Sequence, residues 1–130
     1  MLKILLVDDD EAFLRGMETF LKFKVPGVHI DSSGSSYEAL RLVQADGYGL
    51  IIADWRMPGM DGVMFLKAAK KVSPTVPIIL VTGQHDTDMV ASAKANGAFA
   101  VLQKPVEREE LFGSIVQALR VSAPAQRYRA

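Results

Sequence analysis

Residues 50–62 read LIIADWRMPGMDG, and this stretch decides how the rest of the chain can fold. A run of four apolar or small residues leads directly into Asp54 and is followed by a turn rich in proline and glycine. A short apolar run bounded by turn residues is typical of a strand that is buried on both faces of a sheet. Asp54 is therefore expected where a buried strand leaves the core, and a charge in that place needs a partner.

The composition limits the classes of protein to which the chain can belong. Its 130 residues, of which 49% are hydrophobic, are enough for one domain that folds without disulfides. Fifteen basic residues balance fifteen acidic ones, so no net charge favours nucleic acid or an anionic membrane as a partner. The chain has no cysteine, and its apolar start is too short for a signal peptide or a membrane span. We therefore expect a cytoplasmic protein that binds neither nucleic acid nor membrane directly.

Apolar runs of strand length alternate with longer segments of helical period along the chain. We expect strands at Lys3–Val7, Val28–Ser32, Leu50–Ala53, Pro77–Val81 and Ala100–Gln103. The helical segments are marked by the stripes Phe13–Met17–Phe20–Leu21, Phe65–Leu66–Ala69–Val72 and Leu111–Ile115–Leu119, and less strongly by Tyr37–Gln44 and Asp88–Ala95. This alternation predicts an α/β fold with a doubly wound, five-stranded parallel sheet in the flavodoxin-like order 2-1-3-4-5 and helices on both faces. The domain is expected at residues 1–120, and a C-terminal tail or linker at residues 121–130.

Acidic residues follow two strands that are neighbours in this order. The first strand ends in Asp8, Asp9 and Asp10, and the third ends in Asp54. The carboxyl ends of parallel strands meet at one edge of a sheet, and two unit charges 4 Å apart there repel by about 4 kcal/mol at an effective dielectric constant of 20. A divalent cation would relieve this repulsion, and the oxygen ligands favour Mg²⁺ or Mn²⁺ over zinc or copper.

The fourth and fifth strands end in two further polar residues, Thr82 and Lys104. Magnesium in proteins keeps several waters and recruits phosphate oxygens, which implies a phosphoryl group as the second ligand of this edge. Thr82 can donate a hydrogen bond to such a group and Lys104 can supply a positive charge, while Asp54 beside the metal can act as a nucleophile.

Four motifs together resemble the receiver domain of bacterial two-component response regulators, over essentially residues 2–120. They are VDDD at 7–10, DWRMPGMDG at 54–62, PIILVTG at 77–83 and KP at 104–105. The resemblance implies a domain that accepts a phosphoryl group from a sensor histidine kinase or a phosphotransfer protein and signals to an output domain or partner protein. Such a domain is not an enzyme acting on a separate substrate, because it catalyses only its own phosphorylation and dephosphorylation. The resemblance is compatible with a homodimer.

The resemblance also assigns the acceptor and the metal ligands. Asp54 is implied as the phosphoacceptor and as a ligand of Mg²⁺. Asp9 is implied to bind the ion directly and Asp8 largely through water, with the backbone carbonyl of Arg56 as a further ligand.

The remaining site residues follow from the same resemblance. Thr82 is implied to hydrogen-bond the phosphoryl group and Lys104 to pair with it, and the peptide bond between Lys104 and Pro105 is implied to be cis. Arg56 and Gln84 are implied to flank the path of the water that hydrolyses the phosphoryl group.

One position departs from the family pattern. Receivers commonly carry Tyr or Phe three residues before the conserved lysine, a ring that moves inward on phosphorylation, and here the residue is Val101. Phe99 lies two residues earlier and is expected on the same face if the strand is regular. Because valine has no ring to move, a phosphorylation-independent interaction module and a phosphorelay intermediate stay open as alternatives.

Some acidic residues and both histidines have simpler explanations. Asp9 or Asp10 could cap the first helix, and Asp61 is expected to cap the third. His29 and His85 are expected on the surface, because neither has a second histidine or a cysteine at metal-binding spacing.

Two other classes of protein share either the sheet topology or an aspartate nucleophile at a strand end. A flavodoxin-type carrier would place a flavin phosphate where the aspartates repel it. A phosphatase of the haloacid-dehalogenase type expects a second acid two residues after its nucleophile, and here that residue is Arg56.

Overall fold

The computed structural model describes residues 1–84 and 86–122. The surface prediction for His85 and the linker prediction for residues 123–130 therefore lie outside the described residues. The last helix continues to Ser122, so the first two residues assigned to the tail are helical.

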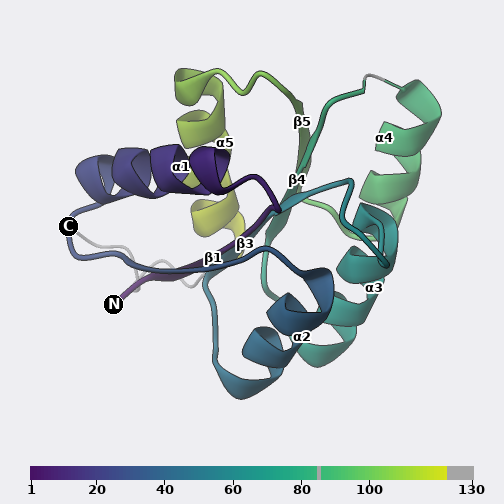
Figure 1. Ribbon diagram of the computed structural model, residues 1–130, viewed down its shortest axis with the longest axis horizontal. Coiled ribbons are helices and arrows are strands. Elements are labelled where there is room, and N and C mark those ends of the chain that lie inside the picture. Colours follow the sequence, from purple (N-terminus) through teal and green to yellow (C-terminus); the bar gives the residue numbers. More distant parts are fainter. Residues whose placement is uncertain (85, 123–130) are drawn as a thin grey trace.

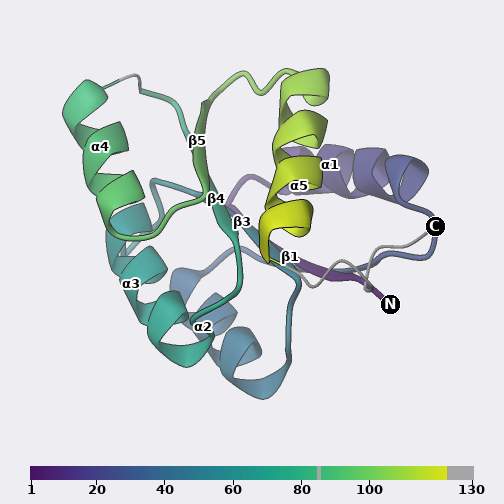
Figure 2. The same cartoon turned by 180° about the vertical axis from the view of Figure 1, so that it is seen from behind.

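Five strands and five helices alternate along the described chain. In order they are β1 (Lys3–Val7), α1 (Glu11–Lys24), β2 (His29–Ser33), α2 (Ser36–Ala45), β3 (Leu50–Asp54), α3 (Gly62–Val72), β4 (Ile78–Thr82), α4 (Thr87–Ala95), β5 (Ala100–Gln103) and α5 (Arg108–Ser122). The strands form one parallel sheet in the order β2-β1-β3-β4-β5, which confirms the predicted fold class. Figures 1 and 2 show α1 and α5 on one face of the sheet and α2, α3 and α4 on the other.

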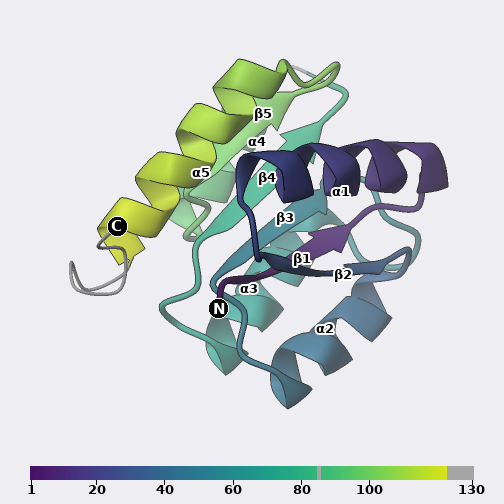
Figure 3. The ribbon, with the colours of Figure 1, turned by 90° about the vertical axis from the view of Figure 1, so that its left-hand side faces the viewer.

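The two faces of the central strands pack against two separate apolar clusters. In β3, Ile51 and Ala53 face α2, α3 and α4, whereas Leu50 and Ile52 face α1 and α5. All five residues of β4 are buried as well. Burying one such aliphatic side chain stabilises the fold by about 1.5–3 kcal/mol, so these strands form a rigid frame. Figure 3, a side view, shows how α1 and α5 cross the sheet in front of this frame.

Three strands end one residue later than the sequence predicts, namely β2 at Ser33, β3 at Asp54 and β4 at Thr82. The N–H of Trp55 donates to the Val81 carbonyl at 2.8 Å, and the N–H of Lys104 donates to the Thr82 carbonyl at 2.8 Å. These ladder bonds include Asp54 and Thr82 in the sheet. Both polar side chains are therefore fixed by a strand and not by a loop.

Polar side chains cap the starts of four helices, namely Asp10 for α1, Ser35 for α2, Asp61 for α3 and Asp86 for α4. Each such cap typically stabilises a helix by about 1 kcal/mol. The prediction for Asp61 is confirmed. Because Asp10 caps α1, neither Asp8 nor Asp9 serves as that cap.

None of the helices in the part of the chain that the structure describes has the length and apolarity needed to cross a membrane.

Candidate functional site

The ends of β1 and β3 bring three carboxylates together. β1 and β3 pair in parallel with Val7 opposite Ala53, so the residues that follow lie side by side. One carboxylate oxygen from each of Asp8, Asp9 and Asp54 lies within 4.8 Å of the others. Asp8 is 1% exposed, Asp54 is partly buried and Asp9 is exposed. Three hard oxygen donors at this spacing fit a divalent ion that keeps some of its waters.

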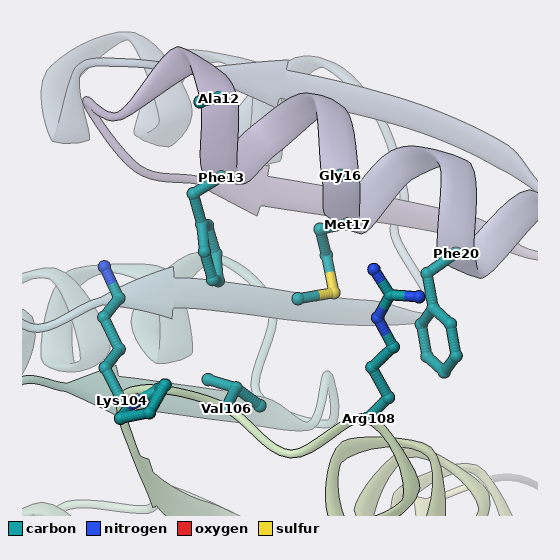
Figure 4. A pocket seen from close by; sticks show the side chains of 9 residues that line it. Ala12, Phe13, Gly16, Met17, Phe20, Lys104, Val106 and Arg108 are labelled. Carbon is teal, nitrogen blue, oxygen red and sulfur yellow. The ribbon is translucent and has the colours of Figure 1, made fainter.

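Lys104 reaches this cluster from the residue after β5. Its ammonium nitrogen lies 2.9 Å from Asp8 Oδ2 and 3.6 Å from Asp54 Oδ1. The same nitrogen lies 4.6 Å from the centre of the Phe13 ring, and Figure 4 shows the lysine pointing from below toward this ring on α1. The peptide bond between Lys104 and Pro105 is cis, as predicted.

One lysine does not neutralise the acidic cluster. Burial, followed by the charge of Asp8, raises the pKa of Asp54 above its ordinary value, although Lys104 and the backbone N–H of Arg56 oppose this. Burial alone would lower the pKa of Lys104, but its hydrogen bond to Asp8 and the charges of Asp8 and Asp54 raise that pKa overall. A bound divalent cation would compensate the remaining negative charge, so the donor set fits Mg²⁺ in charge as well as in chemistry.

Thr82 lies beside Asp54 in the sheet but hydrogen-bonds its own loop. It ends β4, it is 4% exposed, and its neighbour Val81 is paired with Asp54. Its hydroxyl donates to the Gln84 carbonyl at 3.2 Å and accepts from the Gln84 N–H at 3.1 Å. To bond a phosphoryl group on Asp54, the hydroxyl must give up its bond to the Gln84 carbonyl.

The residues predicted to modulate the site differ in their exposure. Arg56, Gln84 and Pro105 are exposed. Val101 is half-buried in β5 and packs against the cluster formed with α2, α3 and α4.

The prediction that Phe99 shares a face with Val101 is wrong. Phe99 packs against the cluster on the α1 and α5 side, on the opposite face of the sheet. It precedes β5, so the alternation of a regular strand does not extend to it. Phe99 therefore cannot replace the missing ring.

His29 is exposed, as predicted, but it is not isolated. Its Nε2 lies 3.0 Å from Asp31 Oδ1, and the Tyr48 hydroxyl donates to Asp31 Oδ2 at 2.6 Å. The bond from Tyr48 lowers the pKa of Asp31, partly against the effect of burial. His29 and Asp31 belong to the edge strand β2, which β1 separates from β3 and thus from the strand that carries Asp54.

Sequence reasoning missed the contacts of residues 33–37, which end β2 and begin α2 and carry no charge. The N–H of Asp8 donates to the Ser33 carbonyl at 3.0 Å, and the hydroxyls of Ser36 and Tyr37 donate to carbonyls of the loop after Asp54. The sequence carries no signal for the last two of these contacts, because they join residues 24 and 22 positions apart in the chain.

Comparisons with known proteins agree with this geometry. The family model described as the response regulator receiver domain matches residues 4–116. The transcriptional regulatory protein GlrR of Escherichia coli is 34% identical over 122 residues, which are 94% of this chain and 27% of that protein. This chain thus spans about a quarter of that relative's length.

Solved structures agree as well. A response regulator receiver domain protein from Clostridium thermocellum superposes with a TM-score of 0.85 at 31% identity, covering 93% of this chain and 96% of that one. The beryllofluoride-activated NtrC4 receiver domain dimer gives a TM-score of 0.88 at 29% identity, covering 95% and 100%.

Proposed function

Because this chain belongs to the response regulator receiver domain family, we propose that it accepts a phosphoryl group on Asp54 from the phosphohistidine of a sensor histidine kinase or phosphotransfer protein. The convergence of Asp8, Asp9 and Asp54 within 4.8 Å, with the Lys104 ammonium 3.6 Å from the acceptor, is the observation that supports this most directly. Family membership removes the flavodoxin-type and haloacid-dehalogenase alternatives.

The residues of the chain divide the work of the transfer. An oxygen of Asp54 attacks phosphorus, and the bond from phosphorus to the donor imidazole nitrogen breaks with its electron pair on that nitrogen. Lys104 and Thr82 donate hydrogen bonds to the phosphoryl oxygens. Asp8, Asp9, Asp54 and the Arg56 carbonyl would hold Mg²⁺, which when bound would neutralise charge on those oxygens.

The partners follow from the relatives. GlrR is a transcriptional regulator and is longer than this chain, which supports an output domain or a separate partner protein as the receiver of the signal. The receiver domain of NtrC4 forms a dimer in its beryllofluoride-activated state, which supports a homodimer as the signalling form of this chain. We place the reaction in the cytoplasm.

The test of the proposed function is transfer from acetyl phosphate in the presence of Mg²⁺. It compares the wild type with Asp54→Asn, which should not be phosphorylated.

Arg56 is expected to slow the hydrolysis of the phosphorylated state. Its side chain is exposed and directly follows Trp55 in the loop after the acceptor, so a long cation there can cover the phosphoryl group and exclude water. We expect Arg56→Asn to lose its phosphoryl group about tenfold faster, equivalent to about 1.4 kcal/mol of activation free energy. Decay of ³²P-labelled protein after removal of the donor measures this rate. Arg56→Lys, which keeps a long cation, is the control, and an equal or slower decay in Arg56→Asn would remove the shielding argument.

Val101 is expected to limit the conformational response. A phosphoryl group shifts an equilibrium only by its differential affinity for two states, and without a ring that repacks between β5 and α4 this difference is small. With beryllofluoride standing in for the phosphoryl group, we expect Val101→Tyr to show a wider change in amide hydrogen exchange over α4 and β5 than the wild type. Val101→Ile, which adds volume without a ring, is the control.

An equal exchange response in Val101→Tyr and wild type would show that Val101 does not limit the switch. A wild type that shows no response to beryllofluoride, although it is phosphorylated, would favour the relay alternative. A wild type that is not phosphorylated at all would favour the interaction module.

A further inference from the structure

Two side chains from the start of α2 hold the far end of the loop that follows Asp54. The Tyr37 hydroxyl donates to the Gly59 carbonyl at 3.2 Å, and the Ser36 hydroxyl donates to the Met60 carbonyl at 3.3 Å. Two successive carbonyl groups of the loop are thus anchored to one helix. The Ser36 bond is buried, so it is shielded from competition by water.

The Tyr37 ring also packs directly on the backbone of the loop. Gly59 has a φ of +83°, a conformation that other residues rarely adopt, and a Cβ at this position would lie 2.9 Å from Cε2 of Tyr37. Backbone and ring therefore touch with no side chain between them. The position of the ring and the course of the loop are coupled.

The two ends of the same loop are joined by its own backbone. The N–H of Gly62 donates to the Trp55 carbonyl at 2.7 Å, and Met57 and Met60 are buried in the core beside α2 and α3. Arg56 lies between these anchors and is exposed. Among the proposed metal ligands from β3 and the loop that follows it, the Arg56 carbonyl is the one outside the strand. The position of this carbonyl therefore depends on how firmly the loop is held.

We infer that Tyr37, together with Ser36, is a positioning residue for the metal site, because it fixes the loop over residues 56–61 before the ion binds. The inference rests on the proposed function, since it takes the Arg56 carbonyl as a ligand of Mg²⁺. A loop released from α2 would have to be ordered by the ion, and that ordering free energy would be subtracted from the affinity for Mg²⁺. Tyr37 is 57% exposed, so its removal affects the core little.

Trp55 provides a direct measure of this affinity. It is the single tryptophan of the chain, it follows Asp54 directly, and it is 8% exposed. Titration of Mg²⁺ against Trp55 fluorescence should compare the wild type with Tyr37→Phe, which keeps the ring, and Tyr37→Ala, which does not. Phe23→Ala is the matched control, because Phe23 is an aromatic residue of α1 that is 79% exposed and whose ring contacts no cation within the described residues.

We expect the dissociation constant for Mg²⁺ to rise about threefold in Tyr37→Phe, about tenfold in Tyr37→Ala and not at all in Phe23→Ala. The rate of phosphorylation by acetyl phosphate should fall by the same factors at limiting Mg²⁺ and return to the wild-type rate at saturating Mg²⁺. A general structural defect would lower the rate at both concentrations.

Two results would overturn the inference, and they can be told apart. An unchanged dissociation constant in both Tyr37 variants, with normal phosphorylation of the wild type, would remove the positioning role and leave the proposed function intact. If the wild type neither binds Mg²⁺ nor is phosphorylated, the proposed function fails and the positioning role fails with it. Tyr37→Phe keeps the test decisive even if Tyr37→Ala folds poorly.

Discussion

We expect Asp54→Asn to abolish phosphorylation by acetyl phosphate in the presence of Mg²⁺, under conditions in which the wild type gains one phosphoryl group. The amide has nearly the shape of the carboxylate but carries no negative charge and is a very weak nucleophile. Asp54 ends a strand whose preceding residues are buried, so the substitution should leave the fold in place. The mass of the intact protein before and after incubation measures the transfer, and the expected loss in the variant is complete.

Asp61→Asn is the matched control for this experiment. Asp61 caps α3 and lies in the same loop, and Asn caps helices about as well as Asp. This variant should be phosphorylated like the wild type. Labelling of Asp54→Asn at the wild-type level would mean that another residue is the acceptor, and would sink the assignment of Asp54.

The arrangement of the fold could be predicted because it depends on patterns within short segments. The run from Leu50 to Ala53 is apolar at every position and is followed by turn residues, which is typical of a strand covered on both faces, and both faces of β3 are buried. The strand ends were less predictable, because Asp54 and Thr82 are held in the sheet by ladder bonds from neighbouring strands. Such bonds depend on partners that are distant in the sequence.

The same division applies to the candidate site. The meeting of Asp8, Asp9 and Asp54 could be predicted, because the strand order alone brings the ends of β1 and β3 together. The details of the side chains could not. The sequence does not indicate that Lys104 lies closer to Asp8 than to Asp54, or that the Thr82 hydroxyl bonds its own loop.

Tyr37 and Phe99 show what local patterns cannot reach. Tyr37 contacts Gly59 only because α2 and the loop after β3 pack side by side, and nothing in the neighbouring residues signals that contact. Strand alternation predicts Phe99 on the same face as Val101, although the strand begins one residue after Phe99. Both cases depend on tertiary packing, which overrides the local periodicity.

Bound Mg²⁺ should change the free energy of unfolding of this protein by more than any single substitution outside the core changes it. Three carboxylates and one lysine leave excess negative charge at the carboxyl edge, and an ion that binds only the folded state adds its binding free energy to the stability. At a hundred times its dissociation constant, Mg²⁺ should raise the free energy of unfolding by about 2.7 kcal/mol. For a domain of this size, that corresponds to a rise of roughly 10 °C in the melting temperature. Thermal unfolding with Mg²⁺ and with a chelator measures the difference.

Asp9→Ala separates binding of the ion from a general effect of salt. Asp9 is exposed and is a proposed ligand of the ion, so its removal should eliminate most of the response to Mg²⁺. The same change removes one of the repelling charges, so the variant should be at least as stable as the wild type when metal is absent. Glu110→Ala removes an exposed acid from the first turn of α5 and should keep the full response. If Mg²⁺ raised the melting temperature of Asp9→Ala and of the wild type equally, the acidic cluster would not be the metal site. Such a result would indicate screening of surface charge by salt, which does not depend on which carboxylate is removed.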